Sequence, residues 1–289
     1  MKTFLKKIKI VNSYLRLKKI KKTKELGIYN YKDIKTHIEN FGIKKGDHIF
    51  IHSSLSKLGY IDGGSETIIK ALKDIIGAEG TLIFPSFCFP GGGLLSTISN
   101  ENYLFDKKKE PSSVGKISET FRKKEGVFRS THPTHSISAI GKHAEFLTKN
   151  HIETGSNFGE GTPFKKMLEL NVKMLGLGVK LPMFTFFHCV EDLNLDLFPG
   201  LYHKNKLPVK VRVNGKIKVF QIPYHDPYFI TDRIEQNNLI EKYFTDYFMS
   251  TKILKTGIIG SGDSILITCK DFYKKTLDLA KNNKTIYKI

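Results

Sequence analysis

The chain has 289 residues, of which 40% are hydrophobic and 26% charged, and a formal net charge of +19. This composition is typical of a globular protein and excludes a disordered chain. The sequence holds no run of 18 apolar residues, so we expect no membrane-spanning helix, and its length suffices for one large domain or two small ones.

The basic excess suggests nucleic-acid binding, but the type of basic residue argues against it. Only five of the 47 basic residues are arginine, whereas phosphate and base recognition favours the arginine fork. No zinc-finger spacing, RNP motif or basic zipper occurs. We therefore expect no specific nucleic-acid partner, and interpret the charge either as compositional drift or as suited to an anionic small-molecule ligand.

The three cysteines, Cys88, Cys189 and Cys269, lie far apart and form no Cys-x-x-Cys pair. This spacing predicts reduced, structural thiols in a cytosolic protein. The N-terminus lacks the apolar segment and cleavage site of a secretory signal, which also favours a cytoplasmic location. Cys189 adjoins His188, but neighbouring helical positions face different directions, so a Cys–His nucleophile is disfavoured.

Residues 1–24 carry ten basic residues and no acidic one, interleaved with apolar residues. We interpret them as a basic amphipathic extension added to a main domain that covers residues 25–289. Two interpretations remain open. The extension is either a helix in peripheral contact with an anionic membrane surface, at the inner membrane face, or a solvated or loosely docked segment.

The main domain alternates between strand and helix patterns, which predicts a mixed α/β fold. Residues 209–222 alternate with period two around Asn214-Gly215, which predicts an antiparallel hairpin excursion. Further strands are predicted at 48–52, 81–87, 136–140 and 172–176, and as a pair around 260–263. Helices are predicted at 65–77 with Ser65 as N-cap, and at 114–124, 142–150, 163–170, 232–248 and 271–281.

The segment Thr185-Phe-Phe-His188-Cys-Val-Glu191 carries the most specific chemistry. His188 and Glu191 are three residues apart, so on a helix both side chains lie on one face. A neutral imidazole held by a carboxylate is a general base near neutral pH. Upstream, the strand that ends in Ser53-Ser54 offers hydrogen-bond donors at a sheet's carboxyl edge, where α/β proteins bind ligands.

Taken in order, several segments resemble the aminoglycoside N3-acetyltransferase family, the antibiotic acetyltransferases unrelated to the GNAT fold. The resemblance covers roughly residues 27–270 and implies a three-layer α/β/α sandwich on a mixed sheet. It also implies acetyl transfer from acetyl-CoA, the cosubstrate, to an amine. The matching phrases are "GDHIFIHSSLSKLGYIDGG", "GAEGTLIFPSF", "SSVGKISETFR", "RSTHPTHSISAIGKHA", "GEGTPF" and "TFFHCVE".

The resemblance also assigns residues. It implies that His188 is the catalytic histidine, Glu191 its carboxylate and Thr185 a group near the thioester. It implies two sets of cofactor-binding residues. The first is the loop along the CoA pantetheine and the turn behind it, Ser53, Ser54, Leu55, Gly63 and Gly64. The second is a strip near the cofactor, Arg129, His132 and Ser136.

The chemistry of acyl transfer suits these residues. We expect His188 to take the proton of the attacking amine, and Glu191, or another carboxylate that the fold brings near, to hold the imidazole tautomer and stabilise the imidazolium. The oxyanion that forms on the thioester is expected to meet backbone N–H groups of the Ser53-Ser54 turn or the Thr185 hydroxyl. No metal is needed. His132 and His135 are spaced like a zinc pair but lack a third ligand at a convincing spacing.

The acceptor amine is the open question. A pocket for polycationic aminoglycosides should be acidic, whereas this chain is basic and suits an anionic acceptor. The hypothesis is therefore an amino sugar on a nucleotide or lipid carrier, of the kind used in surface polysaccharide synthesis. The alternatives are an aminoglycoside 3-N-acetyltransferase that confers antibiotic resistance and, more distantly, a non-catalytic CoA-binding or nucleic-acid-binding protein.

Overall fold

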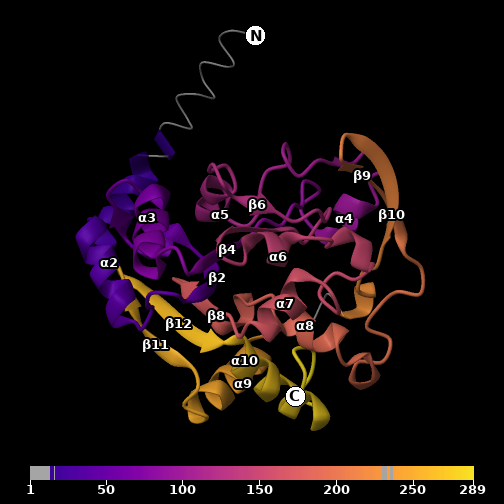
Figure 1. Ribbon diagram of the computed structural model, residues 1–289. Coiled ribbons are helices and arrows are strands. Elements are labelled where there is room, and N and C mark those ends of the chain that lie inside the picture. Colours follow the sequence, from indigo (N-terminus) through magenta and orange to yellow (C-terminus); the bar gives the residue numbers. More distant parts are fainter. Residues whose placement is uncertain (1–13, 16, 230–232, 235–236) are drawn as a thin grey trace.

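A mixed sheet of seven strands forms the centre of the computed structural model, which describes residues 14, 15, 17–229, 233, 234 and 237–289 (Figure 1). The strand order is β11-β12-β8-β2-β4-β7-β6. The central strand β2 pairs in parallel with both β4 and β8, and the outer pairs are antiparallel. The strands are β2 (His48–Ser53), β4 (Thr81–Pro85), β6 (Phe128–Arg129), β7 (Ile137–Gly141), β8 (Lys173–Leu177), β11 (Lys255–Ile259) and β12 (Gly262–Thr268).

Helices cover both faces of this sheet because its strands bury alternate residues in opposite directions. Ile49 and Ile51 of β2 lie in one hydrophobic core and Phe50 in the other. The predicted three-layer α/β/α sandwich is confirmed, and Figure 1 shows the indigo helices α2 and α3 across the strands from α10. The first face carries α2 (Tyr31–Asn40), α3 (Ser65–Ile76) and α5 (Lys116–Phe121), and the second carries α6 (Ala144–Thr148), α7 (Pro163–Glu169), α8 (Phe187–Asp192), α9 (Asn238–Ser250) and α10 (Cys269–Lys281).

The predicted hairpin excursion is also confirmed. Strands β9 (Leu207–Val213) and β10 (Lys216–Ile222) pair antiparallel around Asn214 and Gly215, whose φ angles of 49° and 80° suit a tight hairpin turn. β9 also pairs in parallel with β5 (Leu104–Phe105), so a second sheet forms beside the main one, at the right of Figure 1. The short helix α4 (Leu94–Ile98) packs with β9 over this sheet.

Several element boundaries differ from the prediction. The N-cap of α3 is Gly64 rather than Ser65, because the chain reverses through glycines with positive φ. Helix α9 begins at Asn238, where the Asn237 side chain caps it, and part of the predicted start at 232 lies outside the described residues. α10 begins two residues early, at Cys269, behind a Thr268 cap. β4 ends at Pro85 rather than at residue 87, and the Ser86 and Cys88 backbone N–H groups beyond it still donate to the carbonyls of Ser136 and Thr134.

The N-terminal part of the chain contains two helices. One is α2, which had no prediction and opens on a capping box formed by Asn30 and Asp33. The other covers residues 17–26, agrees with the helical interpretation that was left open for the extension, and crosses the predicted boundary at residue 24. Of the predicted extension, residues 1–13 and 16 lie outside the described part of the chain, while Tyr14, Leu15 and Leu17 are exposed. The parallel pair β1 (Ile28–Tyr29) and β3 (Tyr60–Ile61) joins this region to the domain. Within the described residues, no helix has the length and apolar character needed to cross a bilayer.

Candidate active site

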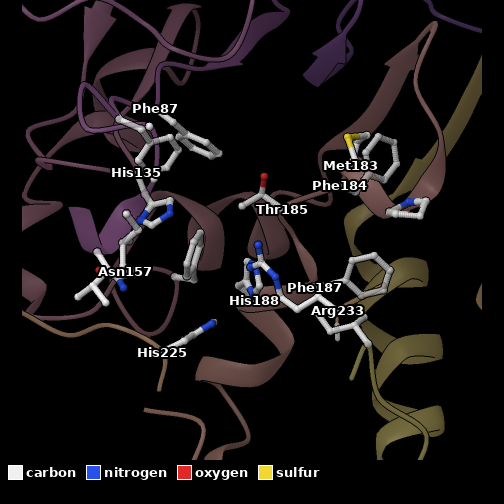
Figure 2. Close-up of a pocket in the computed structure, with 18 of the residues that line it drawn as sticks. Phe87, His135, Asn157, Met183, Phe184, Thr185, Phe187, His188, His225 and Arg233 are labelled. Carbon is white, nitrogen blue, oxygen red and sulfur yellow. The ribbon is translucent and has the colours of Figure 1, made fainter. Parts of the chain in front are cut away.

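A cavity of about 470 Å³ lies beyond the carboxyl ends of the parallel strands (Figure 2). β4 runs into Phe87 and Phe89 on its wall, and β8 leads through a short turn, Leu181–Met183, to Thr185 and α8. In the sheet, β4 lies on one side of β2 and β8 on the other, and both are parallel to it. Such a switch point is where open α/β sheets bind ligands.

His188 and Glu191 form a hydrogen-bonded pair on α8, as predicted from their spacing. His188 Nδ1 lies 2.6 Å from Glu191 Oε2. Both residues are buried, Glu191 to 2% exposure, while His188 still lines the cavity. A charge-assisted hydrogen bond this short fixes the orientation of the ring and leaves Nε2 as the nitrogen for proton transfer.

Burial dominates the electrostatics of this pair. It raises the pKa of the Glu191 carboxyl, and the nearby His225, Tyr287 and Arg233 oppose that rise. Burial also lowers the pKa of His225 to about 3, so this imidazole is neutral at pH 7. His225 lies on the cavity wall with its ring centroid 5.0 Å from that of His188. Burial therefore keeps the pKa of the Glu191 carboxyl above its ordinary value, and these neighbours limit the rise.

Thr185 is positioned by His52. The Thr185 backbone N–H donates to His52 Nε2 at 3.4 Å, and the Thr185 hydroxyl lies 3.2 Å from the same nitrogen. Burial lowers the pKa of His52 to about 3, so the ring is a neutral acceptor, consistent with a strand-end residue rather than a second base. Thr185 lies on the cavity wall, one turn before His188 (Figure 2).

An aromatic wall faces the His188–Glu191 pair. The Phe158 ring lies 5.1 Å from that of His188 and 4.5 Å from that of His135. Its loop is anchored by Asp192, whose carboxylate accepts from the Phe158 backbone N–H at 3.0 Å and from the Ser156 hydroxyl at 2.8 Å. The last residue of α8 therefore fixes the ring that packs on His188.

The loop predicted to contact the cofactor lies outside the cavity that His188 lines. Ser53, Ser54 and Leu55 end β2 and start the next turn, and none of them lines the cavity. The Ser54 N–H donates to the Leu177 carbonyl at 2.9 Å, so the expectation that it serves an oxyanion is wrong. Gly115 lies next to this loop, since a Cβ there would lie 3.6 Å from the Ser53 carbonyl oxygen.

Gly63 and Gly64 form the turn that precedes α3. Their φ angles are 74° and 61°, which side-chain-bearing residues rarely adopt. Neither glycine lines the cavity. The conformation explains why glycine stands at both positions, and the assignment to cofactor binding stays a prediction.

Arg129, Ser136 and His132, also predicted near the cofactor, are buried in a structural network. The Arg129 guanidinium donates to the carbonyls of Ser86 and Glu110 and to the Ser136 hydroxyl, at 2.7, 2.5 and 3.0 Å. Ser136 in turn donates to the Ser86 carbonyl. These contacts give the residues a structural role in fixing the backbone, and contact with a ligand stays a prediction.

His132 closes the turn that precedes β7. Its Nδ1 accepts from the backbone N–H of His135 at 3.0 Å and of Thr134 at 3.3 Å, and its ring stacks on His151 at 4.5 Å. With Nδ1 used this way and burial holding its pKa well below 6.5, His132 is a structural, neutral histidine. His135, by contrast, lies on the cavity wall.

The predicted site residues did not include His135, His225, Arg233 and Ile286, which also line the cavity. His135 precedes α8, the other three follow it at a distance in the chain, and no local pattern marks those three. Ile286 belongs to the C-terminal tail, and its backbone carbonyl accepts from the Ile234 N–H at 2.8 Å. A signal existed only for His135, which stands in the quoted "RSTHPTHSISAIGKHA" segment.

The cysteines match the prediction of reduced thiols. Cys88, Cys189 and Cys269 are free and buried. Burial raises the pKa of the Cys189 thiol well above its ordinary value. A buried, protonated thiol is a poor nucleophile, so Cys189 does not take the role of His188.

Comparison with known proteins decides the family. The sequence profile described as Aminoglycoside 3-N-acetyltransferase matches residues 50–280, which is most of the chain. This chain belongs to the aminoglycoside 3-N-acetyltransferase family. The family resemblance inferred from the sequence motifs is confirmed.

Two curated relatives illustrate the similarity. Aminoglycoside N(3)-acetyltransferase III of Salmonella sp is 30% identical over 176 residues, which is 57% of this chain and 60% of the relative. The SPbeta prophage-derived aminoglycoside N(3')-acetyltransferase-like protein YokD of Bacillus subtilis (strain 168) is 31% identical over 169 residues, 53% of this chain and 61% of the relative. The chain thus spans about 60% of the length of the curated relatives it matches.

Solved structures share the fold. Aminoglycoside acetyltransferase AAC(3)-Xa superposes with a TM-score of 0.75 at 19% identity, over 94% of this chain and 99% of that one. AAC-IIIb in a binary complex with CoASH gives 0.71 at 22% identity, over 90% and 98%. AAC-VIa bound to sisomicin gives 0.72 at 22% identity, over 89% and 99%. At these identities the likeness establishes a common architecture.

Proposed function

We propose that this chain is an acetyl-CoA-dependent N-acetyltransferase that acts on the amine of an amino sugar. The observation that carries the proposal is the 2.6 Å hydrogen bond between His188 Nδ1 and Glu191 Oε2 at the wall of a cavity. This arrangement is a general base with its orienting carboxylate. Family membership supplies the acyl donor, since a relative of the same fold was solved with CoASH.

In the proposed reaction the acceptor nitrogen attacks the thioester carbonyl of acetyl-CoA. His188 Nε2 takes the proton of that nitrogen as the C–N bond forms. The C–S bond then breaks, CoA leaves as a thiolate, and the imidazolium returns the proton to it. Glu191 stabilises the imidazolium, and the Thr185 hydroxyl, on the same wall, is the proposed donor to the oxyanion.

For the acceptor, the comparisons favour an aminoglycoside. The curated relatives are named as aminoglycoside N(3)-acetyltransferases, and AAC-VIa was solved with sisomicin. By this reading the chain transfers acetyl to a 3-amino group and confers antibiotic resistance. The carrier-linked sugar of polysaccharide synthesis draws no support from these relatives.

One observation keeps an anionic amino sugar as a second candidate. The described residues that line the cavity include Arg233 and three histidines and no Asp or Glu. A site for a polycation is ordinarily lined with carboxylates, because it must replace the solvation of several ammonium groups. The described walls therefore suit an acceptor that carries a phosphate or carboxylate beside its amine.

The test is acetyl-CoA turnover, measured as free thiol release across aminoglycosides and nucleotide-linked amino sugars. The matched variants are His188→Ala and His203→Ala, the latter outside the cavity lining. Release that depends on an acceptor, persists in His203→Ala and vanishes in His188→Ala supports the enzyme and identifies the acceptor class. Absence of CoA binding by the folded protein would refute the proposal.

A further inference from the structure

A third ionisable side chain joins the catalytic pair in space. His225 follows β10, and an isolated β-bridge to Tyr202 holds its backbone. One potential ligand atom from each of His188, Glu191 and His225 lies within 4.8 Å of the others. Figure 2 shows His225 below His188, with a nitrogen turned toward it. Residues far apart in the chain thus bring two imidazoles and a carboxylate together beside the cavity.

Two buried polar atoms of this cluster, Glu191 Oε1 and His225 Nε2, make no direct hydrogen bond of good geometry among the described residues. The Tyr287 hydroxyl lies near the Glu191 carboxylate and lowers its pKa, so His225 Nε2 is the clearer case of the two. His225 Nε2 is 3.9 Å from Glu191 Oε2, too far for a hydrogen bond. Buried polar atoms are nearly always satisfied, so a carboxylate oxygen and an imidazole nitrogen left together indicate a missing partner. A metal ion satisfies both atoms, and a bound water is the competing explanation.

We propose that His188, Glu191 and His225 form a binding site for Zn²⁺ or a similar divalent transition-metal ion, and that the bound ion inhibits acetyl transfer. Two imidazoles and one carboxylate, with a further position open to a cavity, make a donor set typical of zinc. With metal–ligand bonds of about 2.1 Å, tetrahedral ligands lie about 3.4 Å apart. The 3.9 Å between His225 Nε2 and Glu191 Oε2 is close to that separation.

Inhibition follows from the shared ligands. Coordination through His188 Nδ1 replaces the 2.6 Å hydrogen bond to Glu191 that orients the ring. Coordination through Nε2 occupies the nitrogen that must take the acceptor's proton. In either case the ion and the general base compete for the same imidazole, so this inhibition rests on the proposed function, whereas metal binding itself does not.

The experiment measures metal binding on the full chain, independently of turnover. Chelator-treated protein competes for Zn²⁺ with a chromophoric chelator, in the wild type, in His225→Gln and in His203→Gln as a matched control. His203 directly follows Tyr202, the bridge partner of His225, is hydrogen-bonded to the Tyr224 hydroxyl and lies outside the cluster. We expect one tight ion per wild-type chain, a loss of at least about tenfold in affinity in His225→Gln and no change in His203→Gln.

A second measurement covers the case in which His225→Gln does not fold. Co²⁺ added to wild-type protein should produce the visible absorption of a four- or five-coordinate site, and equimolar Zn²⁺ should displace it. Where turnover is measurable, Zn²⁺ should inhibit it with a midpoint equal to the binding constant, and a chelator should restore it. Equal affinities in wild type and His225→Gln, an equal loss in His203→Gln, or no Co²⁺ absorption would overturn the site and favour bound water.

Discussion

At the scale of residues, the catalytic proposal depends on two contacts of the His188 ring, one with the Glu191 carboxylate and one with the Phe158 ring. The Glu191 carboxylate is hydrogen-bonded to His188 Nδ1, and the Phe158 ring lies 5.1 Å from the His188 ring. Burial raises the pKa of Glu191, yet its neighbours oppose that rise. An ionised carboxylate at this buried position attracts an imidazolium more strongly than one at the surface would, because both groups are shielded from water.

Replacing either member of the pair should affect the rate more than binding. We expect His188→Ala and Glu191→Gln each to lower kcat about 10²–10⁴-fold, the range for lost general-base assistance. CoA affinity should change little, because neither side chain binds the nucleotide part in the proposed reaction. Thiol-release kinetics and calorimetric CoA binding measure the two effects. Full activity in Glu191→Gln would contradict the role of the carboxylate.

Arg129 offers a test between a structural and a ligand-binding role. Its buried guanidinium donates to the carbonyls of Lys107, Glu110 and Ser86 and to the Ser136 hydroxyl. Arg129→Met strands these acceptors and should lower the free energy of unfolding by about 3 kcal/mol. Arg129→Lys should recover little, since an ammonium lacks the planar fork. Urea denaturation measures the loss. Normal stability combined with lost CoA binding would instead support the cofactor role.

At the scale of elements, the ends of three parallel strands place the site and the short helix α8 presents it. The segments that follow β4, which ends at Pro85, and β8 contribute walls of the cavity, which lies in the space beyond β2. The N-terminal helical residues 17–26 lie outside this arrangement. Leu17 and Leu26 are exposed there, beside a run of lysines.

Membrane contact through the N-terminal extension remains a proposal, and vesicle binding tests it. The full chain should sediment with vesicles rich in phosphatidylserine and be released by high salt, because each basic residue near such a surface contributes about 1 kcal/mol. A variant without residues 2–24 should stay in the supernatant, as should the full chain with neutral vesicles. Equal sedimentation of both proteins would assign the extension another role.

At the scale of the whole molecule, the sandwich buries several histidines in their neutral form. Burial lowers the pKa of His52 and of His151 to about 3, and that of His132 and His135 well below 6.5. Their hydrogen bonds tie β2 to Thr185, and Ser130 to the loop after α6. Burial disfavours a protonated imidazole at each of these places, because the charge loses its solvation there.

These histidines predict a sharp loss of stability in mild acid. In the unfolded chain they protonate near pH 6.5, whereas in the folded chain His52 and His151 stay neutral to about pH 3. The unfolded state therefore binds more protons between these values, so stability present above pH 6.5 falls as the pH drops through this window. Linkage gives about 2 kcal/mol at pH 5 for each of His52 and His151. Urea midpoints measured from pH 7.5 to 4.5 check it. An unchanged midpoint would refute it.

Much of this protein follows from local patterns in its sequence. The His-x-x-Glu spacing places both side chains on one face of α8, and Asn214-Gly215 makes a hairpin, because each depends on backbone geometry within a few residues. The alternating strands and helices were likewise predictable, with errors of one to a few residues at their ends. The motif order carried the family, which the sequence profile confirmed.

Contacts between residues far apart in the chain were decided by tertiary packing and could not be predicted from local patterns. Nothing near His225, Arg233 or Ile286 in the chain marks them as neighbours of His188, yet the second sheet and the C-terminal tail bring them to one cavity. Packing also turned Arg129 and His132 toward backbone atoms, where a motif had suggested a ligand. A sequence pattern specifies which chemical groups exist and which helical face they share, whereas burial and long-range contact set the pKa and the partners of each group.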